Sequence, residues 1–160
     1  MQLVIAHEAG CRLPRGTRAP LLALAARSRP ARARVQLVLG GDALLQRLNR
    51  EFRRRDVPTD VLSFRYDETA AGLDAEAEIY VSLERAASQA RERGHALGRE
   101  VVLLVLHGLL HLQGYDHHSA EEARRMHAAE TRAWRWLGDR WPRLAGAPLV
   151  AVRAPRRGRR

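Results

Sequence analysis

The sequence contains a single cysteine, Cys11, among its 160 residues. One cysteine cannot form an internal disulfide bond, and it cannot supply the several thiolates that close most structural zinc sites. A metal ion in this chain would therefore be held by histidine and carboxylate side chains. We interpret Cys11 itself as a small structural residue.

Long hydrophobic runs are also absent. A transmembrane helix needs about 20 consecutive apolar residues, and the longest candidate, residues 101–106, is interrupted by His107 and Gly108. The N-terminus carries Glu8 and no basic segment, so it lacks the pattern of a signal peptide. We therefore expect a cytoplasmic protein that does not act at a membrane.

Lysine is missing altogether, since all 28 basic residues are arginines. The chain has 18 acidic residues and a net charge of +10, and six of the arginines lie in residues 141–160, which contain no acid. This general use of arginine makes any single arginine weak support for a binding site. The distribution predicts a folded domain over residues 1–138 and a basic, disordered C-terminal tail over residues 139–160.

The length and a hydrophobic fraction of 46% fit one folded domain with a substantial core. Alternating or β-branched segments predict strands at residues 3–8, 33–40, 61–66 and 78–83. Apolar stripes predict helices at residues 19–28, 40–52, 82–94, 98–112 and 119–137. We expect an α+β fold, with a mixed sheet of about four strands packed against helices. The helix at 98–112 is apolar around most of its circumference, so it should be central and buried.

Several helix ends carry recognisable signals. We predict Asp42 and Ser82 as N-caps of two helices, and a capping box of Ser119 with Glu122 at the start of a third. Gly94 is suited to end the helix that begins at Ser82. The acidic and glycine-containing residues 67–76 predict an exposed connection before the last strand.

The segment HGLLHLQGYDH, residues 107–117, contains three histidines. His107 and His111 are four residues apart on the predicted helix, so their imidazoles share a face. Gly114 can take the left-handed conformation that ends a helix, and the turn after it can bring His117 back toward the other two. Three histidines with a fourth position open are typical of a catalytic zinc site. We therefore predict one zinc ion per chain, held by His107, His111 and His117 at the end of the central helix.

An alternative interpretation is that two histidines lie on a helix face by chance and the third serves as a cap. Such pairs on buried helices are uncommon without a metal, which favours the zinc site. His118 should point elsewhere, because it directly follows His117. Asp116 could either orient a metal ligand or serve as a turn residue, and the sequence does not decide between these two roles.

The residue after the first histidine is Gly108. Zinc peptidases with the pattern H-E-x-x-H have a glutamate at this position as general base. Cleavage of a phosphodiester can instead use water activated by the metal or the 2′-hydroxyl of RNA, with cations stabilising the developing charge. The missing glutamate therefore argues against peptide hydrolysis.

Two segments carry a resemblance to a known family. HGLLHLQGYDH is similar throughout to the motif H-G-x-L-H-L-x-G-Y-D-H of the YbeY family of bacterial rRNA maturation factors. LNREFRRRDVPTDVLSF, residues 48–64, resembles the family segment L-N-x-x-(Y/F)-R-x-x-D-x-P-T-(D/N)-V-L-S-F. The resemblance covers about residues 1–138, and it implies a mixed sheet surrounded by helices with zinc on the three histidines.

The resemblance also implies a function. The family is described as zinc-dependent, single-strand-specific endoribonucleases that act in 16S rRNA 3′-end maturation and ribosome quality control. RNA, above all rRNA of the small ribosomal subunit, would be the partner, together with ribosome-assembly proteins, and DNA is not expected. Carried over by position, the catalytic residues would be Arg53, His107, His111 and His117.

Arg53 opens a run with Arg54 and Arg55, and a guanidinium group can hold a phosphate through two hydrogen bonds. Composition alone favours a solvated charged loop for this run, and the position in the motif singles out Arg53 only. Two alternatives to the nuclease stay open. One is a zinc hydrolase of another substrate, such as a peptide, and the other is an RNA-binding ribosome-assembly factor whose zinc is mainly structural.

Overall fold

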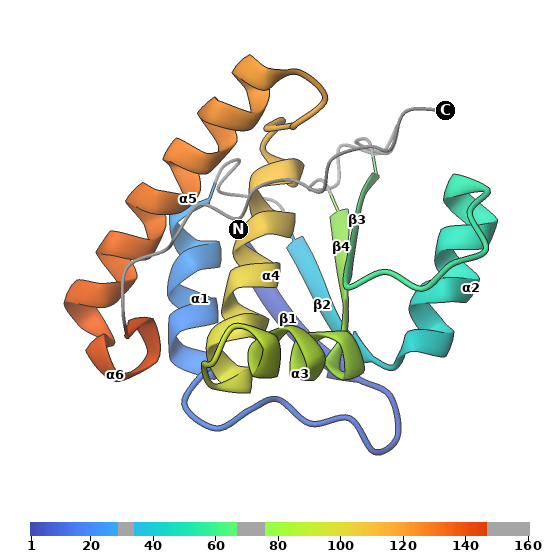
Figure 1. The fold of residues 1–160 in the computed structure, drawn as a ribbon, viewed down its shortest axis with the longest axis horizontal. Coiled ribbons are helices and arrows are strands. Elements are labelled where there is room, and N and C mark those ends of the chain that lie inside the picture. Colours follow the sequence, from blue (N-terminus) through green and yellow to red (C-terminus); the bar gives the residue numbers. More distant parts are fainter. Residues whose placement is uncertain (29–33, 67–75, 147–160) are drawn as a thin grey trace.

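A computed structural model describes residues 1–28, 34–66 and 76–146, which adopt an α+β fold (Figure 1). The strands of this part of the chain are β1 (Gln2–His7), β2 (Arg34–Gly40), β3 (Val61–Tyr66) and β4 (Glu76–Ser82). Its helices are α1 (Arg18–Arg27), α2 (Asp42–Arg53), α3 (Leu83–Glu92), α4 (Leu97–Leu112), α5 (Ala120–Arg140) and α6 (Pro142–Ala145). The predicted fold class, strands and five longer helices are confirmed, with shifts at their ends.

The four strands form one mixed sheet in the order β1-β2-β4-β3. β1, β2 and β4 are parallel, whereas β3 pairs with β4 in the antiparallel direction. Neighbouring parallel strands must be joined by a crossover connection. The connection from β1 to β2 contains α1, and the connection from β2 to β4 contains α2 and β3. The sheet therefore ends at β3, an edge strand that also contacts α4.

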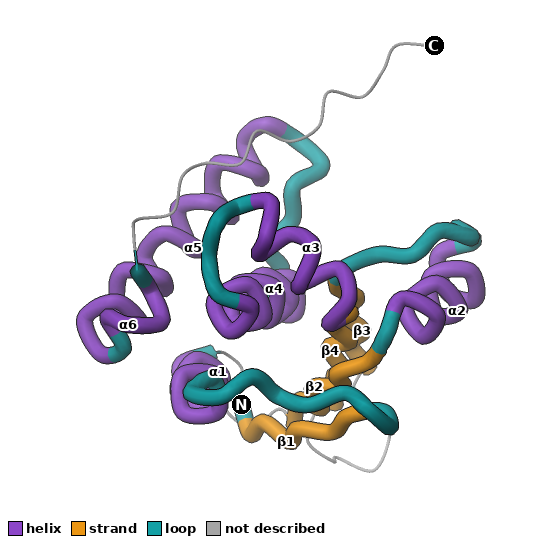
Figure 2. The backbone as a smooth tube through the Cα atoms, turned by 60° about the horizontal axis from the view of Figure 1, so that its bottom comes forward, coloured by secondary structure: helices purple, strands orange, loops and turns teal. Residues whose placement is uncertain are grey.

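Side chains alternate between the two faces of the sheet. On one face, Leu37 and Ile79 join the main core with α1, α3, α4 and α5. On the other face, Leu62 packs with Leu44 and Leu45 of α2 in a smaller cluster. Figure 2 shows α2 and α4 on opposite sides of the strands. The sheet thus separates α2 from the helix that carries two of the histidines.

Helix α4 is the predicted central helix, and ten of its sixteen residues are buried. One of them is Glu100, whose carboxylate accepts a hydrogen bond from Arg93 and lies 3.0 Å from His95. Within the described ranges, no helix alone is long and apolar enough to span a membrane; α3 and α4 pass that test only as a pair bent by 115°. His107 and His111 lie on the last turns of α4, and both are only partly buried.

Two of the predicted helix starts are confirmed. The Ser82 hydroxyl accepts a hydrogen bond from the Arg85 backbone N–H at 3.2 Å, and Ser119 forms the reciprocal capping box with Glu122. At the other end of α3, Gly94 has a φ of +67°, the left-handed conformation that favours glycine.

The prediction of Asp42 as an N-cap is wrong. Gly41 occupies that position, and Asp42 is the first residue of α2. The carboxylate of Glu84 accepts the Asp42 backbone N–H at 2.6 Å, so a side chain from α3 satisfies the start of α2. The Asp42 carboxylate instead accepts a hydrogen bond from the Ser82 hydroxyl at 2.6 Å.

The C-terminal part of the described chain is helical beyond the predicted end of the domain. Helix α5 continues to Arg140, past the predicted end near residue 137, and the short helix α6 follows. Trp141 and Leu144 pack against the main core. Residues 147–160 of the predicted tail and residues 67–75 of the predicted connection lie outside the described ranges. The division at residue 138 stays a prediction.

Candidate metal centre

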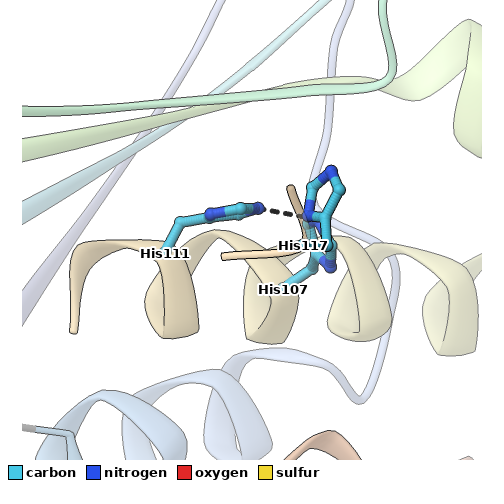
Figure 3. Close-up of side chains that lie close together, drawn as sticks. All are labelled: His107, His111 and His117. Atoms are coloured by element: carbon cyan, nitrogen blue, oxygen red, sulfur yellow. Dashed lines mark hydrogen bonds between the residues drawn. The ribbon is translucent and has the colours of Figure 1, made fainter. Parts of the chain in front are cut away.

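The three histidines predicted as ligands converge at the C-terminal end of α4 (Figure 3). His107 and His111 lie one turn apart, and their Nε2 atoms are 3.1 Å apart. Gly114 ends the helix with a φ of +86°, as its position in the sequence predicts. Its N–H donates to the carbonyl of His111 at 2.9 Å, and the chain then turns back to bring His117 beside the other two rings.

The spacing of the nitrogen atoms fits a metal ion. One ring nitrogen of each histidine lies within 4.8 Å of the other two, and in the described part of the chain this is the one group with such an arrangement. In a tetrahedral zinc site, bonds of about 2.0–2.1 Å place the ligand nitrogens about 3.3 Å apart. The separation of 3.1 Å between His107 and His111 is close to this value, and it also permits an N–H···N hydrogen bond. The cluster could therefore hold a metal ion.

The electrostatic environment keeps His111 neutral. The pKa of His111 is lowered to about 4, mainly by burial and also by the neighbouring imidazoles of His107 and His117. A neutral imidazole has a lone pair to offer, which a metal ligand requires. His111 is thus prepared for ligation at neutral pH.

Sequence reasoning missed Glu130. This residue of α5 accepts a hydrogen bond from Nδ1 of His107 onto its Oε1 atom at 2.8 Å. Glu130 follows the buried Met126 and Ala129 on the inward side of the helix. An acidic residue on an apolar helix face was the signal that could have identified it, because such a carboxylate needs a partner.

The turn between the second and third histidines resolves the role of Asp116. Its Oδ1 atom accepts the backbone N–H of His117 at 2.7 Å, and its Oδ2 atom lies 2.9 Å from Nε2 of His118. The His117 ring lies 3.8 Å away, too far for an orienting hydrogen bond. The His117 N–H is also the main cause that lowers the pKa of Asp116. Asp116 is therefore a turn residue, and the exposed His118 is not part of the three-histidine group.

Packing accounts for the glycine that stands where peptidases have a glutamate. Gly108 is buried against β4, and a Cβ atom on it would lie 3.0 Å from Cγ2 of Ile79. Real Cβ contacts are seldom this short, so even a methyl group would require the Ile79 side chain to move, and a longer side chain would need more space. The close packing therefore disfavours a general base at this position.

The three consecutive arginines come from the end of α2, whereas the three histidine rings lie on α4 and the turn after it. Arg53 is the last residue of α2, and Arg54 caps that helix in the left-handed conformation with a φ of +55°. Both are exposed, as is Arg55, and α2 lies on the opposite face of the sheet from α4. The catalytic role of Arg53 stays a prediction.

Arg65 on the edge strand β3 was not predicted, and it donates to the carbonyl of Leu112, the neighbour of His111, at 3.4 Å.

A cavity of about 320 Å³ borders the other side of His107. Its polar and charged lining residues are His107, His127, Glu130, Glu100, Arg93, Gln89 of α3 and Asp60, which directly precedes β3. Carboxylates outnumber the one arginine in this lining, so the cavity does not suit the phosphate backbone of RNA.

The fold and the site define a class: α+β proteins with a three-histidine centre at the end of a buried helix. A family model described as Endoribonuclease YbeY matches residues 18–138. The chain belongs to the YbeY family, and the resemblance found in its two motifs is confirmed.

The relatives named Endoribonuclease YbeY include three bacterial proteins that are each 44% identical to this chain. The matches extend over 108 residues of the Carboxydothermus hydrogenoformans protein (65% of this chain, 72% of that one), 118 of the Heliobacterium modesticaldum protein (65% and 69%) and 119 of the Pelotomaculum thermopropionicum protein (71% and 78%). Among solved structures, the solution structure of TM1509 from Thermotoga maritima matches with a TM-score of 0.54 and 27% identity, covering 89% of this chain and 95% of that one.

Proposed function

We propose that this chain is a zinc-dependent endoribonuclease. The observation that carries the proposal is the convergence of His107, His111 and His117 in a member of the YbeY family. The relatives are named endoribonucleases, which makes RNA the substrate class and a phosphodiester the bond that breaks. Three imidazoles would hold one zinc ion and leave one coordination position open, as catalytic zinc sites do.

The residues of the chain have separate roles in this proposal. Bound zinc would supply the positive charge that polarises the phosphate. His111 offers a lone pair because burial keeps its ring neutral. Arg53 would bind a phosphate oxygen and offset the negative charge that develops as the P–O bond breaks. Zinc peptidases have a glutamate as general base at the position where this chain has Gly108, which is packed against Ile79. A peptide is therefore the weaker substrate candidate.

We further propose single-stranded RNA, and specifically the 3′ end of 16S rRNA in the small ribosomal subunit, as the substrate. We also propose the cytoplasm as the protein's location and ribosome-assembly proteins as its partners, as the resemblance of the two sequence motifs implies. The acidic lining of the cavity near Glu130 does not favour an RNA strand. A strand would instead approach the histidines over the edge strand β3, where Arg65 is exposed.

A ribosome-assembly factor with a mainly structural zinc is the second candidate. One observation favours it: the carboxylate that reaches the cluster from α5, Glu130, is already engaged with His107, so it is not free to act as a general base. Such a factor would bind the same RNA without cleaving it.

Metal analysis combined with an RNA cleavage assay tests the proposal. The purified protein should contain about one zinc per chain, and His111→Ala should lose both the metal and cleavage of single-stranded RNA. His118→Ala is the matched control, because this histidine is outside the three-histidine group and its side chain is 80% exposed. Zinc binding without cleavage by the wild-type protein would favour the assembly factor. Full zinc content in His111→Ala would refute the metal centre.

A further inference from the structure

The contact between His107 and Glu130 joins two helices at the candidate metal centre. The donor and acceptor atoms are 2.8 Å apart, and the two side chains are 32% and 24% exposed. Neither residue is near the other in the sequence, so the packing of α5 on α4 creates the contact. His107 reaches Glu130 with Nδ1 while its Nε2 atom faces His111.

We propose that Glu130 is a positioning residue that holds His107 in the tautomer required for metal binding. Carboxylate oxygens accept hydrogen bonds, so in the contact with Oε1 of Glu130 the hydrogen lies on Nδ1 of His107. The lone pair then lies on Nε2, the atom that faces the other ligands. A carboxylate partner also increases the basicity of an imidazole ligand. This inference rests on the proposed metal centre and concerns the chain's own residues around it.

The position of Glu130 is difficult to explain by stability alone. It lies on a stretch of α5 that includes buried Met126, Ala129 and Trp134. A carboxylate there must be removed from part of its water, which costs free energy unless a partner replaces that water. Its other described partner is His127, whose Nδ1 atom is 3.8 Å from Oε2 and beyond hydrogen-bond distance. His107 is therefore the contact that accounts for an acid at this place.

Zinc affinity provides the first test. We would measure the dissociation constant for zinc by competition with a chromophoric chelator, using the wild type, Glu130→Ala and Glu130→Gln. Glu130→Ala should bind zinc about 10- to 100-fold more weakly, the range found when such partners of ligands are removed. Glu130→Gln should lose less, because its amide oxygen still accepts the hydrogen bond but carries no charge. Glu121→Ala, at an exposed position of the same helix, should bind like the wild type.

The tautomer of His107 in metal-free protein provides the second test, because it needs neither zinc nor activity. Long-range ¹H–¹⁵N spectra of the histidine rings should show the Nδ1–H form of His107 in the wild type and in Glu130→Gln. In Glu130→Ala the Nε2–H form should appear. Thermal unfolding of each metal-free variant checks that the fold is retained.

Two results have different meanings. If Glu130→Ala keeps wild-type zinc affinity and the Nδ1–H form of His107, the positioning role is refuted while the metal centre stands. If the wild type itself binds no zinc, the proposed metal centre is refuted, and a change of tautomer in Glu130→Ala still supports the control of the His107 ring by Glu130.

Discussion

At the scale of single residues, two arginines are candidates for a role in RNA cleavage. Position in the family motif favours Arg53, whereas the hydrogen bond to Leu112 brings Arg65 to the end of α4 beside His111. Neither residue is buried, so neither is needed for the core. Substitution can therefore separate a role in RNA cleavage from a role in stability.

We expect Arg53→Ala to lower RNA cleavage by about 10²-fold or more, the usual cost of losing a group that stabilises transition-state charge. Zinc content and the melting temperature should not change, because the side chain is exposed at the end of α2. Single-turnover cleavage of a single-stranded RNA measures the effect. Arg53→Lys should recover only part of the rate, since lysine keeps the charge but loses the paired hydrogen bonds.

Arg47→Ala is the matched control, since Arg47 is exposed on the same helix. It should cleave at the wild-type rate. A wild-type rate for Arg53→Ala under the same conditions would remove Arg53 from the catalytic residues and direct attention to Arg65.

At the scale of helices and strands, the packing between α4 and β4 is close at Gly108. We expect Gly108→Glu to lower the free energy of unfolding by about 3 kcal/mol or more, because it adds volume and an unpaired charge to a packed position. Gly108→Ala should cost much less, since alanine favours a helix over glycine by about 1 kcal/mol and this offsets part of the crowding. Chemical denaturation of both variants measures the difference. Wild-type stability of Gly108→Glu would show that β4 can yield at Ile79.

The stability of the paired strands β3 and β4 should depend on pH in the alkaline range. The Glu78 carboxylate accepts hydrogen bonds from the hydroxyls of Tyr66 and Tyr80. The pKa of each tyrosine rises to about 12, mainly through the bond to Glu78 for Tyr66 and mainly through burial for Tyr80. Because the folded pKa lies above the ordinary value of 10, this stabilisation is complete below about pH 10 and is lost as the pH rises through about 12.

Glu78→Ala should therefore lower the pKa of both tyrosines, and that of Tyr66 by more. Ultraviolet absorbance of tyrosinate during an alkaline titration measures the change, with Tyr66→Phe and Tyr80→Phe to assign the steps. Glu76→Ala is the control, because Glu76 pairs with Tyr66 in the strand register but its carboxylate faces Arg34. Equal titration curves for Glu78→Ala and the wild type would contradict the role of this carboxylate.

The elements also show which features of the molecule could be predicted from the sequence. Hydrophobic periodicity located the strands and the long helices, and the three histidines were found because they lie on one helix and the turn after it. Glu130 was missed because its contact with His107 depends on how α5 packs on α4, which no local pattern records. The cap of α2 was misassigned for the same reason, since Glu84 on another helix supplies it.

At the scale of the whole molecule, charge is concentrated in the C-terminal residues. We expect removal of residues 147–160, which contain five arginines, to weaken RNA binding and to reduce its salt dependence. The slope of log affinity against log salt should fall by about 0.7 for each phosphate of a single strand that the shortened protein no longer neutralises. Ending the chain at Gly146 retains Trp141 and Leu144, which pack against the core. Binding titrations at several salt concentrations measure the slope.

The position of RNA cleavage should not change in the shortened protein, because the histidines and Arg53 are retained. A shifted cleavage site would show that residues 147–160 select the substrate. An unchanged slope would show that their arginines do not bind phosphate.

The placement of all three histidines within residues 107–117 has a consequence for the order of folding. The three parallel strands of the sheet join residues far apart in the chain, such as Gln2 with Arg34 and Arg34 with Glu76, so long loops must close before these strands can pair. The histidines need only the last turns of one helix and the turn that follows. A metal ion could therefore be captured early, while the sheet is still forming, and would then act as a nucleus that fixes the end of α4 for the strands to pack against.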